Sequence, residues 1–371
     1  MFMNPLSRRT GWKQRPCSSQ KNRWRARAGL IWGLLFFASF QLGMTLYMDY
    51  CRPELQDPEY GQKLALLRAR LQKQEKRPLI LVLGSSRSEL GIRPEALPPL
   101  HVDGETPLVF NFALTGSGPV MELLCLRKLL AAGIHPTQLI VEVLPPLLHQ
   151  EGAWAEENWL NIDRLSIRDL LMLRRFWQHP GSSLLQGIQS RLVPWFSNRY
   201  IIMSRFAPCW LTWETRQDDW GAIGSSGWLP YHHPVVDAKE YQHGLEFAHK
   251  QYAPGLNQFH VSEVPDRALQ ELLDLCRVEH IAATLLLMPE GRDFQSWYSP
   301  AVREEIDCYL AEVGVHYAVP IIDARSWMED GAFFDSHHLL PSGATIFTQR
   351  LGREALQPLL EANGILARGN W

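Results

Sequence analysis

Residues 28–48 contain no charged side chain, and this one segment constrains the rest of the chain most strongly. It reads AGLIWGLLFFASFQLGMTLYM, with Gln41 as the only strongly polar interruption. A helix rises ~1.5 Å per residue, so 21 residues cover a hydrocarbon core of ~30 Å. The segment therefore predicts one transmembrane helix, and the globular part of the protein must be built from the residues around it.

The charge on either side of this segment is uneven and predicts its orientation. The 28 residues at the start hold no acid and eight of the 37 basic residues, namely Arg8, Arg9, Lys13, Arg15, Lys21, Arg23, Arg25 and Arg27. Residues 29–371 then hold 29 basic and 39 acidic residues, a net charge of −10. The positive-inside bias predicts a cytosolic tail (1–27) and a body outside the cytoplasmic membrane, in a periplasm-like space. The acidic body argues against a nucleic-acid partner.

Two other interpretations of residues 28–48 are a cleaved signal peptide and a buried core helix. The apolar part of a signal peptide usually runs only ~7–15 residues and ends at small residues. This segment is longer and ends in the bulky residues 46–50 (LYMDY), so we favour an uncleaved single-pass anchor. The basic flank makes the buried core helix the weakest of the three. Cys17 is then cytosolic, and the five cysteines outside have no close spacing typical of zinc sites or disulfide frameworks.

The remaining chain predicts a stalk followed by an α/β domain. We expect residues 49–78 to form a solvated stalk with a short amphipathic helix at 62–76, and residues 79–371 to form the domain. Apolar runs predict strands, and periodic segments between them predict helices. The expected strands are 79–83, 108–112, 138–144, 283–288 and 318–323, and the expected helices are 121–132, 265–280, 300–313 and 342–362. This alternation predicts a three-layer, doubly wound parallel α/β sheet of flavodoxin-like type.

Residues 150–260 interrupt the alternation of strands and helices. They hold eight of the 14 tryptophans: Trp154, Trp159, Trp177, Trp195, Trp210, Trp213, Trp220 and Trp228. Tryptophan clusters more often serve packing than ligand binding. We interpret the segment as a helical insertion that forms a cap above the functional site.

Polar residues that can carry chemistry follow the first and the last predicted strands. In parallel sheets the functional site lies beyond the carboxyl ends of the strands. Gly84-Ser85-Ser86-Arg87-Ser88 follows the first strand, and its serines fit either an exposed nucleophile or a helix N-cap. Asp335 precedes His338 by three residues in the loop before the last helix, a spacing that lets a carboxylate orient an imidazole as a base.

These segments resemble the SGNH/GDSL hydrolase superfamily. Its first block, usually Gly-Asp-Ser, corresponds to Gly84-Ser85-Ser86, and its last block corresponds to Asp335-x-x-His338. Residues 84–92, 109–116 and 287–298 also resemble a membrane-anchored branch near the polysaccharide and teichoic-acid acylation proteins of bacterial envelopes. The resemblance implies Ser86 as nucleophile, His338 as base and Asp335 as its orienting acid. It implies no cofactor or metal, an acylated glycan as substrate, and a membrane-bound acyltransferase as a partner.

The chain departs from the family pattern in the groups that would hold an oxyanion. Gly116 is the best candidate for the second-block glycine, with Gly118 next. The third block normally offers an asparagine, but the corresponding segment here reads Glu142-Val-Leu-Pro-Pro-Leu. Arg87 and Asn111 are candidates to replace that donor. Arg87 could also bind a carboxylate or phosphate of the substrate, and it equally fits a salt bridge to an acid of the cap. We give Glu142 a structural role because a carboxylate repels an oxyanion.

Three classes of function follow for this chain. The leading hypothesis is an extracytoplasmic serine esterase or O-acyltransferase that acts on acyl esters, with acetyl the expected group, of an envelope glycan. A non-catalytic SGNH-fold scaffold protein of an envelope modification system is the alternative, because the third-block asparagine is missing. A metallohydrolase built on His232-His233 and His337-His338 is the weakest, since no carboxylate lies at ligand spacing beside the first pair.

Overall fold

The computed structural model of the chain describes residues 19–368, except 53–54, 74–76, 102–104, 150–155, 157–161, 178–179, 213–215, 217–218 and 258. Parts of the sequence-based predictions fall outside these residues. They are the basic tail up to residue 18, with Cys17, and three tryptophans of the insertion, Trp154, Trp159 and Trp213.

Five parallel strands form the centre of the molecule. They are β1 (Leu79–Leu83), β2 (Leu108–Asn111), β3 (Gln138–Glu142), β4 (Ala282–Leu287) and β5 (Ile321–Asp323), in the order β2-β1-β3-β4-β5. Every residue of β1, β2 and β3 is buried, which explains why these strands are continuous apolar runs. The predicted α/β fold with a parallel sheet is confirmed, and all five predicted strands are present.

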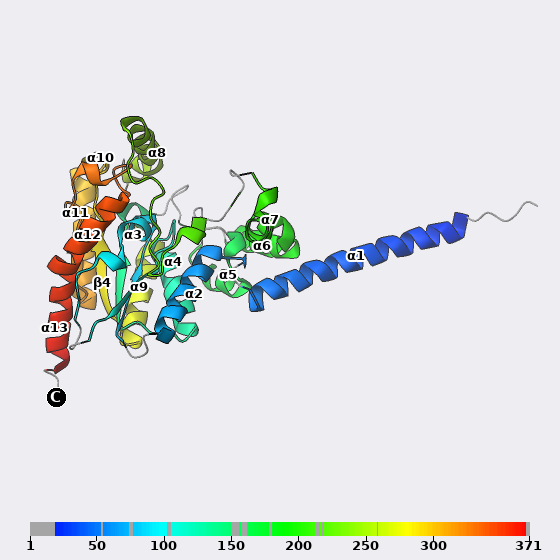
Figure 1. Cartoon of the computed structure of the whole chain (residues 1–371), viewed down its shortest axis with the longest axis horizontal. Coiled ribbons are helices and arrows are strands. Elements are labelled where there is room, and N and C mark those ends of the chain that lie inside the picture. Colours follow the sequence, from blue (N-terminus) through cyan, green and yellow to red (C-terminus); the bar gives the residue numbers. More distant parts are fainter. Residues whose placement is uncertain are drawn as a thin grey trace, which may run out of the picture.

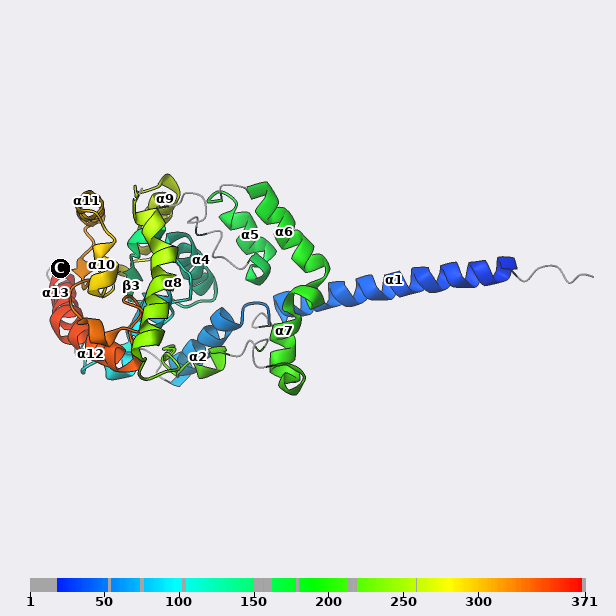
Figure 2. The same ribbon diagram turned by 90° about the horizontal axis from the view of Figure 1, so that it is seen from above.

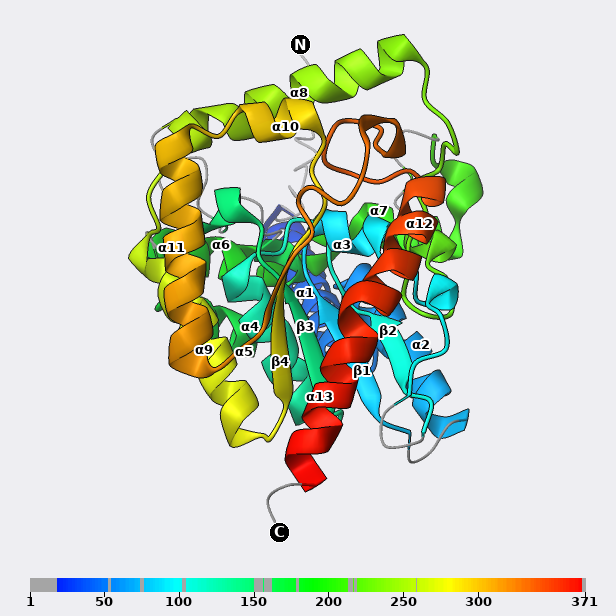
Figure 3. The ribbon, with the colours of Figure 1, turned by 90° about the vertical axis from the view of Figure 1, so that its left-hand side faces the viewer.

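Helices cover both faces of the sheet, and neighbouring residues of one strand face opposite cores. Leu81 packs with one helical layer and Ile80 with the other. The first layer holds α2 (Pro58–Lys73), α4 (Pro119–Ala131), α9 (Glu263–Val278) and α11 (Pro300–Tyr317). The second holds α12 (Pro341–Leu351), a π-helical turn (Gly352–Leu356) and α13 (Gln357–Arg368). Figure 3 shows α12 and α13 crossing the sheet on this second face.

Helix α2 corrects the prediction of a solvated stalk. The helix begins at Pro58 and packs into the core under the sheet, where Leu67 and Lys63 are fully buried. Leu64 and Leu71 pack against the same cluster. The apolar stripe that predicted an amphipathic helix therefore belongs to the domain itself, and burying it is more favourable than leaving it in water.

Helix α1 (Ser19–Tyr50) projects from the body as one long rod (Figure 1). Its residues Arg23–Tyr50 are long and apolar enough to cross a membrane, and almost all of this stretch is exposed. Gln41 and Met48 are exceptions, since both are buried where α1 meets the body.

The insertion divides into two parts with different positions. Helices α6 (Pro180–Leu192) and α7 (Pro194–Phe206) contact α1, and α5 (Ile167–Leu173) contacts α6 (Figure 2). Helix α8 (Ala238–Asn257) instead lies across the end of the sheet where the strands finish (Figure 3). The predicted cap is therefore only the last part of the insertion. The described cysteines, Cys51, Cys125, Cys209, Cys276 and Cys308, are all free thiols.

Candidate active site

In the turn after β1, Ser85 and Ser86 take different positions, one as a helix N-cap and the other with its hydroxyl at the cavity. Helix α3 (Ser86–Gly91) begins directly after Ser85, whose hydroxyl oxygen accepts a hydrogen bond from the Arg87 N–H at 3.1 Å. Ser85 is thus the N-cap, which satisfies one of the free N–H groups of the helix start. The Ser86 hydroxyl is left to face another partner, and its Oγ lies 2.8 Å from Nε2 of His338.

The loop after β5 holds Asp335 against the same histidine. Asp335 Oδ2 lies 2.7 Å from His338 Nδ1, and Oδ1 accepts the backbone N–H of His338 at 2.8 Å. Because a carboxylate only accepts, Nδ1 carries the ring proton and Nε2 accepts from the Ser86 hydroxyl. Burial by itself raises the pKa of Asp335, but the adjacent His338 and His337 outweigh it and hold that pKa well below its usual range.

His337 has a different environment from its neighbour. It is buried, its ring stacks on Phe294 at a centroid distance of 5.2 Å, and it meets the Tyr252 ring edge-on at 5.1 Å. Burial, reinforced by the charge of His338, lowers the pKa of His337 to about 4. A neutral, packed ring is expected at pH 7. Only His338 of the pair faces the serine.

A cavity of about 450 Å³ opens over Ser86 and His338. Its floor comes from the loops that follow the strands, and one wall comes from α8. The lining is mainly apolar and comprises Ser85, Ser86, Leu90, Thr115, Gly116, Leu144, Leu147, His243, Gly244, Phe247, Gln251, Tyr252, Phe334, Asp335, His337 and His338.

Helix α8 approaches the loop of Asp335 very closely at one residue. A Cβ atom on Gly244 would lie 2.9 Å from Cβ of Asp335 and 3.2 Å from the carbonyl oxygen of Phe334. Cβ contacts under 3.0 Å essentially do not occur, so a larger residue here would push the helix away from the loop. The glycine explains how a helix of the insertion can rest directly on the loop.

Two backbone N–H groups at the cavity are available for an oxyanion. Among the described residues, neither the Ser86 N–H nor the Gly116 N–H has a hydrogen-bond acceptor, although both residues line the cavity. Gly116 has a φ of 77°, a left-handed conformation that glycine adopts without strain. The neighbouring Thr115 is fixed by two carboxylates, because its N–H donates to Glu59 at 2.9 Å and its hydroxyl donates to Glu89 at 2.8 Å.

Arg87 and Asn111 are not placed as the sequence predicted. Arg87 is 1% exposed and donates to the carbonyl oxygens of Met288 and Pro289 at 3.0 and 2.7 Å. Its guanidinium also pairs with Glu290 at 3.4 Å, so Arg87 forms a salt bridge, but its partner lies after β4 and not in the cap as predicted. Asn111 donates to backbone carbonyls of α3 and of the residue after it. Neither side chain lines the cavity, so the oxyanion role predicted for them is wrong.

Glu142 at the end of β3 has the structural role that the sequence suggested. Its Oε2 accepts the N–H of Ser85 at 2.8 Å and of Ser88 at 3.2 Å, and the Ser85 hydroxyl donates to the same carboxylate. A Cβ on Gly84 would lie 2.5 Å from this oxygen, so the carboxylate fits only beside a glycine. Glu142 thereby fixes the turn that presents Ser86.

The sequence analysis missed a buried ionic network beneath Thr115 and Gly116. Lys63 of α2 is 0% exposed, its Nζ lies 2.8 Å from Glu89 Oε1, and it also donates to the carbonyl of Ala113. One signal was present in the sequence. Lys63 and Leu67 are four residues apart and share a helical face, so the spacing placed a lysine on the apolar side of the helix.

The same loop also contains the one group of described residues close enough together to hold a metal ion. Ligand atoms of Asp335, His337 and His338 lie within 4.8 Å of one another. Both oxygens of Asp335 and both ring nitrogens of His338 already have hydrogen-bond partners, which fits a proton relay better than a metal site. His232 and His233 join no such group in the described part of the chain, and their rings pack beside Tyr231.

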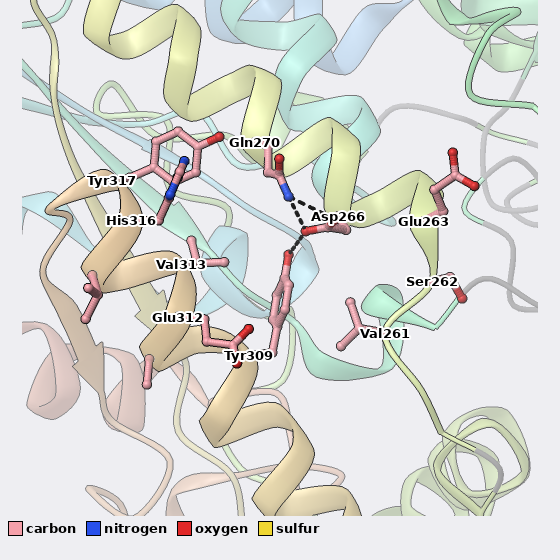
Figure 4. A pocket seen from close by; sticks show the side chains of 12 residues that line it. Val261, Ser262, Glu263, Asp266, Gln270, Tyr309, Glu312, Val313, His316 and Tyr317 are labelled. Carbon is pink, nitrogen blue, oxygen red and sulfur yellow. Dashed lines mark hydrogen bonds between the residues drawn. The ribbon is translucent and has the colours of Figure 1, made fainter.

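A second, larger hollow of about 790 Å³ lies between α9 and α11 (Figure 4). Tyr309 donates to Asp266 at 2.9 Å there, and Gln270 donates to the same carboxylate. Burial, with Asp266 beside it, raises the pKa of Tyr309, so this phenol stays protonated and is a poor nucleophile. The chemistry is therefore concentrated at the first cavity.

Comparisons with known proteins give little beyond this geometry. No family model matches the chain, and no curated protein sequence matches it. Among solved structures, a protein of Bacteroides fragilis described as a "putative acylhydrolase" matches 81% of this chain and 97% of its own, with 10% identity and a TM-score of 0.35. A likeness this distant carries no argument, so the functional assignment depends on the site itself.

Proposed function

We propose that the protein is a serine-dependent ester hydrolase or O-acyltransferase. The observation that supports it is the continuous relay from Asp335 through His338 to Ser86, with contacts of 2.7 and 2.8 Å beside a cavity. This is the arrangement in which an oriented imidazole takes the proton of a serine hydroxyl.

The reaction follows from the position of each group. Ser86 Oγ attacks the acyl carbon while its proton passes to Nε2 of His338, and the carbonyl oxygen becomes an oxyanion. The N–H groups of Ser86 and Gly116 stabilise that charge. Collapse breaks the ester bond, and His338 returns the proton to the departing alcohol. Water or a sugar hydroxyl then attacks the acyl-Ser86 ester, again through His338, and frees the enzyme.

The oxyanion site that we propose has two donors instead of three. The third-block asparagine of the resembling family is replaced by Glu142, which is committed to Ser85 and Ser88. Losing one such donor typically lowers turnover ~10²–10³-fold. A slow enzyme is therefore expected.

The cavity favours an acyl group longer than the acetyl expected from the sequence. The cavity of about 450 Å³ beside Ser86 must hold the acyl group together with part of the alcohol, so the character of its wall is the better guide. Leu90, Leu144, Leu147 and Phe247 make its wall apolar.

The resemblance to envelope acylation proteins supports an ester of an envelope glycan as substrate and a membrane-bound acyltransferase as the partner that supplies it. Helix α1 supports an anchored protein, and the basic residues before residue 28 support a body on the extracytoplasmic side.

Fluorophosphonate labelling of the full-length protein in detergent tests the nucleophile. Wild type is expected to label and Ser86→Ala is not. Ser88→Ala is the matched control, because Ser88 lies in the same helix and its Oγ has no hydrogen-bond partner among the described residues. If wild type labels no better than Ser86→Ala, the catalytic proposal fails and the scaffold alternative replaces it.

A series of p-nitrophenyl esters tests the acyl group. Wild type is expected to prefer octanoate or butyrate to acetate, and Leu147→Trp, which fills the cavity, is expected to reverse that order. Acetate as the best substrate of wild type would contradict the proposal of a longer chain.

Protease digestion of intact cells tests the topology. The body is expected to be cut only from the extracytoplasmic side, and cleavage from the cytosolic side would contradict the anchor.

A further inference from the structure

Helices α6 and α7 are joined to α1 by polar contacts near the end of its apolar segment. The hydroxyl of Thr45 donates to the carbonyl oxygen of Arg191 at 2.9 Å, and the N–H of Trp195 donates to Gln41 Oε1 at 3.5 Å. The Arg191 guanidinium also pairs with Asp49 at 2.5 Å. Gln41, the one strongly polar residue of the apolar segment, is 4% exposed because α7 covers it.

The contacts of Gln41 and Thr45 lie within the stretch expected to cross the membrane. That stretch ends at Met48, and a helix rises ~1.5 Å per residue, so Thr45 lies ~4.5 Å and Gln41 ~10 Å inside its end. The turn between α6 and α7 meets α1 at the same level. Backbone groups within a bilayer must be satisfied by protein atoms, and Thr45 and Gln41 satisfy the Arg191 carbonyl and the Trp195 N–H.

The side chains around this turn are apolar and exposed. Leu185, Ile188 and Leu192 recur at helical spacing and share one face of α6, and three more follow at the turn. We call this set the tip cluster; it consists of Leu185, Ile188, Leu192, Val193, Trp195 and Phe196, each between 37% and 66% exposed. Arg199 of α7 lies over the Phe196 ring at 4.2 Å, where its charge can reach lipid headgroups.

We propose that the tip cluster is inserted into the outer leaflet of the membrane beside α1, as a second and interfacial membrane contact. Figure 2 shows α6 and α7 beside the end of α1 that joins the body. Amphipathic helices in the interface bury their apolar face ~5–10 Å deep, which matches the depth at which Gln41 and Thr45 hold this turn. The proposal depends on α1 crossing the bilayer, as argued above, and does not depend on the chemistry at Ser86.

The contact fixes the body relative to the membrane plane. A single helix allows the domain to tilt and rotate around its end. A second contact through α6 and α7, tied to α1 by the Asp49–Arg191 pair, removes that freedom. The lipid surface therefore becomes a fixed boundary of the extracytoplasmic domain.

Lipid contact is measured with a single NBD label on the full-length protein in phosphatidylcholine vesicles that contain doxyl-labelled lipid. Cys17 and the exposed Cys51, Cys209 and Cys308 are replaced by serine. Cys125 and Cys276 remain, because they are buried and burial raises the pKa of Cys276 to about 12. The label is placed at Phe196→Cys, and at Leu192→Cys as a second tip position.

Two further label positions serve as controls. Phe37→Cys lies within α1 and reports whether that helix is in the bilayer, and Val315→Cys lies on α11, where Val315 is 84% exposed. We expect doxyl lipid to quench the label at Phe37, Phe196 and Leu192 and to leave it unchanged at Val315, with a quenching depth of ~5–10 Å for the tip.

The outcomes separate the two claims. Quenching at Phe37 without quenching at Phe196 and Leu192 would leave α1 as an anchor and overturn the proposal, whether the tip lies in water or against another protein copy. No quenching at Phe37 would overturn the anchor and the proposal together. Quenching at Val315 equal to that at Phe196 would also overturn the proposal, because the tip cluster would then contact lipid no more than the opposite side of the domain does.

Discussion

Replacement of Glu142 tests how the protein presents its serine. Glu142→Ala removes a buried carboxylate that accepts hydrogen bonds from the N–H groups of Ser85 and Ser88. Glu142→Gln is the matched control, since its amide oxygen can still accept both bonds at the same place while the charge is lost. The pair of variants therefore separates the hydrogen bonds from the charge.

The magnitude follows from the groups left behind. Each buried donor without an acceptor costs ~1–3 kcal/mol, so two stranded N–H groups cost about 2–6 kcal/mol of the free energy of unfolding. A typical domain has only ~5–15 kcal/mol in total, so Glu142→Ala is expected to be markedly less stable. Glu142→Gln keeps one acceptor oxygen for both N–H groups but replaces the other oxygen with an amide donor. It is therefore expected to lose about 1 kcal/mol, the net value of the hydrogen bond from the Ser85 hydroxyl to Oε1.

Two assays check this on the full-length protein in detergent. Thermal unfolding followed by tryptophan fluorescence is expected to show a clear decrease in Tm for Glu142→Ala and a small one for Glu142→Gln. Below the lower Tm, fluorophosphonate labelling of Ser86 is expected to slow strongly in the alanine variant only, because the turn no longer fixes Ser86 against His338. If Glu142→Ala unfolds and labels as wild type does, the carboxylate does not hold the turn and the reasoning is refuted.

Three further predictions concern the histidine loop and the helix above it. Asp335→Asn is expected to lower ester turnover by about 10⁴-fold through loss of the His338 orientation, as is typical of Ser-His-Asp sites; unchanged kinetics would argue against the relay. Because the pKa of His337 is lowered, the unfolded chain binds more protons than the folded protein between pH 6.5 and about 4. The free energy of unfolding of wild type should therefore fall by up to about 3 kcal/mol as the pH falls through that window. Denaturant titrations at each pH check this, and His337→Phe should show a weaker dependence of stability on pH. Gly244→Val is expected to displace α8 from Asp335, to lower the free energy of unfolding by ~1–3 kcal/mol and to slow fluorophosphonate labelling of Ser86. Gly221 has open space around it, so Gly221→Ala should change neither the stability nor the labelling rate.

The features that sequence patterns could predict are those decided by neighbouring residues. The strands at 79–83 and 138–142 were found because a run of apolar residues bounded by turns needs burial on both sides. Ser86, Asp335 and His338 were selected because residues after parallel strands gather at one edge of the sheet. The structure brings these three within hydrogen-bond distance.

Features decided by distant contacts were predicted poorly. The position of Arg87 depends on the carbonyls of Met288 and Pro289, two hundred residues away, and no local pattern indicates which acceptor an arginine finds. The insertion was taken as one cap, but the contact of Gln41 with Trp195 draws α7 to the anchor while Gly244 lets α8 rest on the site. Both contacts need the tertiary fold to be known.

The burial of α2 has a practical consequence for how the domain can be cut from its anchor. The helix that follows the anchor supplies Lys63 as the counter-charge of Glu89 and supplies Glu59 as an acceptor for Thr115, so it supports from beneath the loop that lines the cavity. A soluble version that starts at residue 79 would leave Glu89 buried without its partner, a change that typically costs ~3–5 kcal/mol. This domain therefore cannot be moved onto another anchor without carrying residues 58–73 with it.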